Sequence, residues 1–156
     1  VYDRAHTRDI PSLGGFVQKL PWVAVAFIVG GFVSMGMPGL SGFVAEFPIF
    51  LGLWDGPAFA PDPNWLTGTF NYYGLIAVIA ALGIIVTAAY VLRVVGQVFF
   101  GEFNAERFPH VSAITVLDKV ALLILVFWLV LLGVYPRLMA PMIESGVRPI
   151  VSMLGG

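Results

Sequence analysis

The sequence predicts an all-α fold, a polytopic bundle of transmembrane helices in which one helix is discontinuous. Hydrophobic residues make up 59% of the chain and charged residues only 11%, against about 25% charged residues in an ordinary soluble domain. Long uncharged runs separate the few charges, and crossing the ~30 Å hydrocarbon core takes ~20 helical residues. Three apolar segments reach that length, namely 22–53, 72–93 and 114–136.

The composition also excludes several kinds of structure and partner. Transmembrane strands alternate apolar and polar residues, whereas the run 75–82 is apolar on all sides. The net charge of −1 leaves no basic surface for nucleic acid. The absence of cysteine excludes disulfides, thiolate zinc sites and iron–sulfur clusters. We therefore expect no nucleic-acid partner and no cofactor held by cysteine.

The placement of basic residues predicts which loops lie on which side of the membrane. Lysine and arginine are retained on the cytoplasmic side, and they occur in 1–21 and 94–113 but not in 54–71. We therefore expect 1–21 and 94–113 to be cytoplasmic loops and 54–71 to be an outer loop. By parity the tail 137–156 lies on the outer side, where an amphipathic stripe interrupted by a glycine and a proline predicts an interfacial segment.

The first apolar segment, 22–53, is too long for a single crossing, because its helix would measure about 48 Å at 1.5 Å per residue. Its middle carries residues that interrupt helices, namely Gly36, Pro38, Gly39, Ser41 and Gly42. Each half is too short to span alone, which leaves a discontinuous helix or a re-entrant loop. Such backbone is tolerated within a membrane only where it is buried in protein or lines a watery cavity, and it recurs at the ion sites of transporters.

Glu46 lies just past this interruption and is isolated in apolar sequence. Residues 20–45 carry no charge, and the chain is uncharged again from Glu46 to Trp54. A carboxylate at such a depth is costly, and its default interpretation is an ion or proton pathway. The alternative is a structural carboxylate, satisfied by a neighbouring helix or placed at the N-terminus of the second half-helix, where the dipole favours negative charge.

The remaining polar residues predict little chemistry. Arg93 ends the second span, where it either reaches the cytoplasmic interface or lines a channel. His6 and His110 each lie in a loop without an acidic or cysteine cluster at ligand spacing, so we expect solvated histidines and no metal site. The sequence holds no phosphate-binding loop, no plausible Ser–His–Asp set and no cofactor motif.

Several stretches of the chain resemble one family of membrane proteins. They are 34–47, 2–9 with 13–15, 88–93 with 98–101, and 132–136. In order and spacing they are similar to the second broken helix, the preceding loop, the next helix end and the final helix of the antiporter-like subunits of respiratory complex I. The resemblance covers about 1–136 and corresponds to the last third of a family member. Since the chain begins at Val1 without an initiator Met, we expect a C-terminal piece of a longer polypeptide.

Residues at the break distinguish types of subunit within this family. One type has Pro-Gly at the break and Glu beyond it, as Pro38, Gly39 and Glu46 read here. The other types and related cation/proton antiporters usually have Pro-Pro or a similar break and a Lys. The resemblance implies that Glu46 is the terminal proton-exchanging group of a half-channel, in a subunit without a cofactor of its own. The family's earlier Glu–Lys pair and central Lys have no counterpart in this sequence.

The resemblance implies a proton-translocating membrane-arm subunit of an NADH:quinone oxidoreductase, and thus part of a translocase in which electron transfer elsewhere drives proton movement. Its expected partners are the other membrane-arm subunits, the lipid bilayer, protons and water. Its expected location is the bacterial plasma (inner) membrane, crossed several times. The alternatives are a subunit of a related cation/proton antiporter or membrane-bound hydrogenase, or a passive membrane scaffold.

Overall fold

The computed structural model describes residues 1–54 and 72–153, and within them every regular element is a helix. In chain order the elements are α1 (Tyr2–Ala5), η1 (Ile10–Ser12), η2 (Phe16–Gln18), α2 (Pro21–Ser34), α3 (Ser41–Trp54), α4 (Tyr72–Phe99), α5 (Val116–Val134), η4 (Pro136–Leu138) and α6 (Ala140–Met153). The expected outer loop 54–71 lies outside the described residues except for Trp54, which ends α3.

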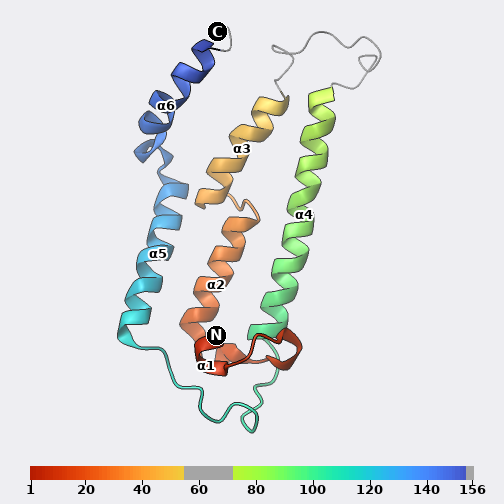
Figure 1. Cartoon of the computed structure of the whole chain (residues 1–156), viewed down its shortest axis with the longest axis vertical. Coiled ribbons are helices and arrows are strands. Elements are labelled where there is room, and N and C mark those ends of the chain that lie inside the picture. The colour runs from red at the N-terminus through yellow and green to blue at the C-terminus, as the bar shows by residue number, and fades with distance from the viewer. Residues whose placement is uncertain (55–71, 154–156) are drawn as a thin grey trace.

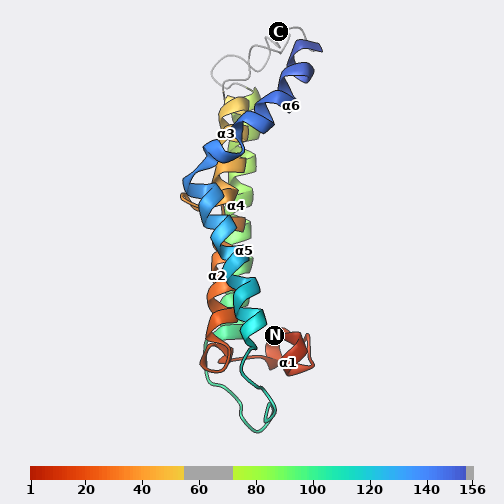
Figure 2. The same cartoon turned by 90° about the vertical axis from the view of Figure 1, so that its left-hand side faces the viewer.

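The central element of the bundle is the interrupted pair α2 and α3. The two helices follow one another along nearly the same line, with α4 on one side and α5 on the other (Figure 1). Both α2 and α3 contact both of these flanking helices. Seen from the side, the bundle has a narrow profile (Figure 2). Because α3 continues in the direction of α2, the first apolar segment forms an interrupted helix and not a re-entrant loop.

The helices lie within or across the segments expected to be apolar spans, and their ends differ from the expected bounds. α4 and α5 are long and apolar enough to cross a membrane, whereas α2 and α3 are each shorter. α4 continues past Arg93 to Phe99 because a charged side chain does not interrupt a helical backbone, and Gly101 in the left-handed region (φ 97°) follows its end. α5 begins one residue after Thr115, which forms a capping box, and ends before Pro136 begins η4.

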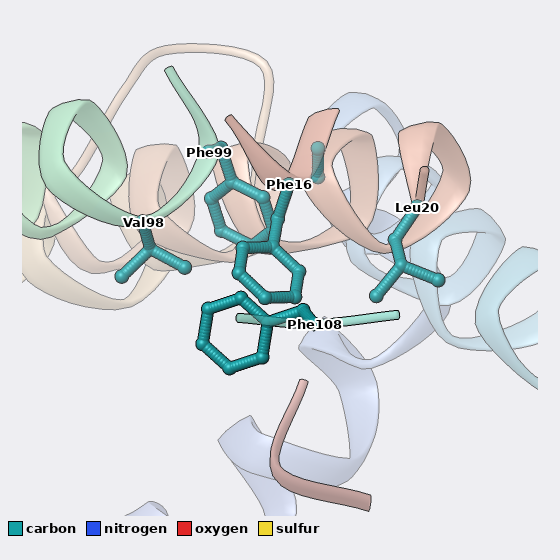
Figure 3. Close-up of a cluster of buried hydrophobic side chains, with 6 residues drawn as sticks. Phe16, Leu20, Val98, Phe99 and Phe108 are labelled. Carbon is teal, nitrogen blue, oxygen red and sulfur yellow. The ribbon is translucent and has the colours of Figure 1, made fainter. Parts of the chain in front are cut away.

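Buried side chains gather at one end of the bundle, in what we call the aromatic cluster (Figure 3). It consists of Phe16, Leu20, Ala24, Val98, Phe99 and Phe108. The Phe16 ring meets the rings of Phe103 and Phe108 edge-on, with centroids 5.4 Å and 5.3 Å away. Gly15 donates its backbone N–H to the Phe100 carbonyl at 3.1 Å. The segment before α2 is therefore packed onto the end of α4 and the loop that follows it.

The two expected cytoplasmic loops meet at this same end. The Lys19 ammonium lies 5.6 Å from the centre of the Phe103 ring, and the Arg107 guanidinium lies 5.9 Å from that of Phe108. The N-terminus and the loop after α4 lie at one end of the bundle and α6 at the other (Figure 1). Basic residues from two distant parts of the sequence thus share one end of the molecule.

The tail after α5 differs from its expected form. The chain changes direction at η4 and then forms α6, which runs through Gly146 and Pro149 as one helix. The expected interruption is absent because a proline removes one N–H from the helical ladder without obliging the helix to end. An exposed ion pair between Arg148 and Glu144, 2.7 Å from nitrogen to oxygen, spans one turn of α6.

Candidate functional site

The break between α2 and α3 contains its own helix cap. α2 ends at Ser34 and α3 begins at Ser41, as two half-helices, and the residues between them form turns. Gly36 adopts φ 65°, donating its N–H to the Val33 carbonyl at 3.1 Å, while the Met37 N–H bonds the Phe32 carbonyl at 3.1 Å. This pair of bonds with a left-handed glycine is the Schellman motif that ends many helices.

The residues predicted to break the helix have different places in the structure. Gly36, Pro38 and Gly39 lie in the turns, whereas Ser41 and Gly42 belong to the first turn of α3. A Cβ on Gly42 would overlap the Val33 carbonyl oxygen near the end of α2. Gly42 is therefore needed for the close approach of the two half-helices, and its role is not to interrupt one of them.

α5 packs closely against the break through a residue that sequence reasoning missed. A Cβ on Gly133 would overlap the Gly39 carbonyl oxygen and the backbone of Leu40. The only signal in the sequence is a single glycine near the end of a helix otherwise rich in Leu and Val. The break is thus covered by backbone contact with α5 on this side.

Glu46 lies in the second turn of α3, and its side chain points back toward the break. A Cβ built on Gly36 would lie 2.5 Å from Glu46 Oε2. That oxygen is buried and has no hydrogen-bond partner among the residues that the structure describes. Burying a carboxylate oxygen without a partner is costly, so this oxygen is an unusual feature of the described chain.

Neither form of the structural alternative, a cap or a satisfied ion, is seen for Glu46 Oε2 among the described residues. The first turn of α3 contains no acidic residue, so Glu46 does not cap the second half-helix. Its carboxylate lies beside Gly36 at the C-terminal end of α2, where the helix dipole carries partial negative charge and offers an anion no stabilisation. Within residues 1–54 and 72–153, no neighbouring side chain satisfies Oε2 either.

Arg93 and the two histidines stand apart from this site. Arg93 is exposed on α4, and among the described residues no ion pair joins it to Glu46. His6 and His110 belong to no group of three possible metal ligands in the part of the chain that the structure describes. The break therefore brings Glu46 together with the predicted glycines but not with Arg93.

A second polar contact ties the N-terminal segment to α5, away from the break. Arg4 donates to the hydroxyl of Ser112 at 2.5 Å and to the Asp118 carboxylate at 3.4 Å. The same carboxylate accepts the backbone N–H of Thr115 at 3.1 Å, as part of the capping box. This contact orders the start of α5 and shows none of the features of a buried site.

Comparison with known proteins agrees with the geometry of the break. A family model described as NADH:quinone oxidoreductase/Mrp antiporter, transmembrane, matches residues 1–60, which include the break and Glu46. The chain is 35% identical to NADH-quinone oxidoreductase subunit M of Rhodobacter capsulatus over 97% of its length and 26% of that relative. It is 32% identical to NAD(P)H-quinone oxidoreductase chain 4 of Synechococcus sp. (strain CC9902), again over 97% of the chain and 26% of the relative.

An interrupted apolar helix with one buried carboxylate oxygen at its break, together with these matches, is typical of an integral membrane subunit of the antiporter-like class. The chain is a homologue of NADH:quinone oxidoreductase subunit M, which is named chain 4 in the cyanobacterial relatives. This is the Glu-bearing type expected from Pro38, Gly39 and Glu46. The chain spans about a quarter of the length of the curated relatives it matches, somewhat less than the expected third.

Proposed function

We propose that this chain is the part of a proton-translocating membrane-arm subunit of NADH:quinone oxidoreductase in which Glu46 exchanges protons. The observation that carries the proposal is the buried Glu46 oxygen, which has no partner among the described residues and faces a break in an apolar helix. Ionisable groups in such places mark proton pathways by default. The names of the relatives, which are both subunits of quinone oxidoreductases, favour this function over a separate cation/proton antiporter, a membrane-bound hydrogenase or a passive scaffold.

The arrangement suits a group that gains and loses a proton. Glu46 Oε2 has no partner among the described residues that would hold the carboxyl group in place. The turns at 35–40 bring non-helical backbone beside this oxygen, and such backbone is tolerated in a membrane where it lines a hydrated path. We assign Glu46 the role of holding a proton and passing it to water at the break.

The same proposal gives the chain its place in the membrane. α2 and α3 together form one discontinuous transmembrane helix, with α4 and α5 as continuous spans beside it. Residues 1–21 and 94–113 face the cytoplasm of a bacterium, and α6 lies at the interface on the outer side of the plasma membrane. The partners are the other membrane-arm subunits, lipid, protons and water, and redox cofactors reside in other subunits.

For Arg93 we propose contact with the cytoplasmic interface of the membrane and not with the proton path. It is exposed six residues before the end of α4, a distance that a long side chain covers by extending toward the headgroups. In the complete complex, Arg93→Gln should leave the number of protons taken up per electron unchanged. A reduced ratio would instead assign Arg93 to the channel.

The decisive experiment replaces the carboxyl group of Glu46 in the complete complex. Glu46→Gln keeps the shape and most of the hydrogen-bonding capacity of the side chain while removing its titratable proton. In complex reconstituted into vesicles, we expect normal assembly and a strongly reduced proton uptake per electron transferred. A purely structural carboxylate predicts impaired stability, by a few kcal/mol at most, with a normal ratio.

A matched control makes the same chemical change at an exposed carboxylate. Glu144→Gln removes the charge of a side chain that is 63% exposed and, within residues 1–54 and 72–153, is paired only with Arg148. It should leave proton uptake per electron unchanged, because surface ion pairs contribute little. A normal proton uptake per electron in the Glu46→Gln complex would refute the proposed function.

A further inference from the structure

Gly36 has two separate properties, and helix capping explains only one of them. Its φ of 65° is what the Schellman motif at the end of α2 requires. The Schellman motif is formed by backbone groups alone and does not involve Glu46. The second property is that the space of a Cβ on Gly36 is already taken by Glu46 Oε2, which would lie only 2.5 Å away.

Gly39 separates the two properties within the same turns. Its φ of 89° also lies in the left-handed region, so an alanine there meets similar backbone strain. A Cβ on Gly39, however, meets no atom within 4 Å. The collision with the carboxylate therefore distinguishes Gly36 from its neighbour, while the backbone strain is common to both.

We propose that Gly36 is a positioning residue for Glu46, whose missing side chain leaves the space in which the carboxylate rests against the end of α2. This inference rests on the proposed role of Glu46 as the proton-exchanging group. A Cβ is attached directly to the backbone and has no rotamer by which to withdraw. A methyl group at this position therefore obliges the Glu46 carboxylate to move.

Displacement of the carboxylate should lower the rate of proton exchange more than it lowers the stability of the fold. Proton transfer requires donor and acceptor within hydrogen-bond reach, and misplacing a reacting group by about 1 Å can lower a rate ~100-fold. Glu46 Oε2 has no protein partner among the described residues that would hold it in its new place. Moving the Glu46 carboxylate therefore changes its distance to the water with which it would exchange a proton.

The test compares Gly36→Ala with Gly39→Ala in the complete complex in vesicles. We expect the initial rate of proton uptake per assembled complex to fall about 10-fold or more for Gly36→Ala relative to Gly39→Ala. The infrared carbonyl band of protonated Glu46, assigned by its loss in Glu46→Gln, should shift in Gly36→Ala and stay in place in Gly39→Ala. Equal rates and an unmoved band in both variants would overturn the proposal.

A double variant tests whether the effect passes through the carboxylate. Glu46→Asp withdraws the carboxylate by one methylene group and so makes room for a methyl on residue 36. Gly36→Ala combined with Glu46→Asp should therefore pump no more slowly than Glu46→Asp alone, because the two changes are coupled. Losses that multiply, as for independent sites, would contradict the proposal. Should Gly36→Ala prevent assembly, restored assembly in the double variant supports the proposal and continued failure overturns it.

These outcomes are distinct from failure of the proposed function. Normal proton uptake by the Glu46→Gln complex would refute the role of Glu46 in pumping, whatever Gly36→Ala does to the band. Loss of uptake in Glu46→Gln, with equal behaviour of Gly36→Ala and Gly39→Ala, would refute only the role of Gly36.

Discussion

The aromatic cluster and the break each depend on a glycine with φ 65°, Gly15 in one region and Gly36 in the other. Beside Gly15 the neighbouring atoms are backbone, since a Cβ there would overlap the amide nitrogen of Phe103, and its own N–H is bonded to Phe100. Beside Gly36 the neighbouring atom is a carboxylate oxygen without a partner among the described residues. The same backbone conformation thus serves close packing in one region and leaves room for an ionisable group in the other.

This difference separates the residues that hold the chain together from those that carry its chemistry. Phe16 is fully buried and packed against two aromatic rings, so the aromatic cluster contributes chiefly apolar burial. At the break a buried oxygen without a hydrogen-bond partner in the described part of the chain is retained at a cost in stability. Stability and proton exchange should therefore respond to different substitutions.

The largest effect on stability is expected for Phe16→Ala, which empties the centre of the aromatic cluster. Replacing a buried phenylalanine with alanine costs about 3–5 kcal/mol. We expect a marked loss of assembled complex and a lower thermal unfolding temperature, while the complexes that do assemble keep a normal proton-to-electron ratio. Phe16→Leu keeps most of the apolar volume and should cost less. A reduced ratio with normal assembly would erase the distinction between the two regions.

An intermediate effect is expected for Gly133→Ala, which acts on the break from α5. The added Cβ overlaps the backbone of Gly39 and Leu40, and overpacking of this kind costs about 1–3 kcal/mol. We expect a moderate fall in thermal stability together with reduced proton uptake per electron, measured in the same preparation. Gly83→Ala is the matched control, because a Cβ there meets nothing within 4 Å. Identical behaviour of the two variants would show that α5 does not position the break.

The smallest effect is expected for Thr115→Ala, which removes the cap of α5 at the end where the aromatic cluster lies. Loss of an N-cap costs about 1 kcal/mol, and proton uptake per electron should not change. Thr87→Ala serves as control, since the Thr87 hydroxyl bonds the Gly83 carbonyl within a helix and caps nothing. A thermal unfolding temperature equal to that of the Thr87→Ala complex would refute the contribution of the cap.

The helices and the position of the break follow from local properties of the sequence. Charge-free runs predict the spans, Pro38 and its neighbouring glycines predict the interruption, and the isolation of Glu46 marks the candidate site. The extension of α4 past Arg93 was not predicted, because a charge was taken as the end of a helix. It ends instead near Gly101, where the backbone turns left-handed.

Contacts between distant parts of the chain were beyond sequence reasoning. Gly133 lies about 94 positions from Gly39, and nothing in either neighbourhood indicates that their backbones meet. The approach of Glu46 to Gly36 depends on the path of the chain through the turns between α2 and α3, which residue types alone do not fix. The packing of Phe16 against Phe108 likewise requires the folded arrangement of the loops.

The central position of the interrupted helix has a mechanical meaning. α2 and α3 each contact both α4 and α5 (Figure 1). The two continuous helices therefore pack along both sides of the interrupted helix and span its break. Bending at the break is then opposed on both sides by packed helices. The relative position of Gly36 and Glu46 therefore depends on α4 and α5 as well as on the turns that join the two half-helices.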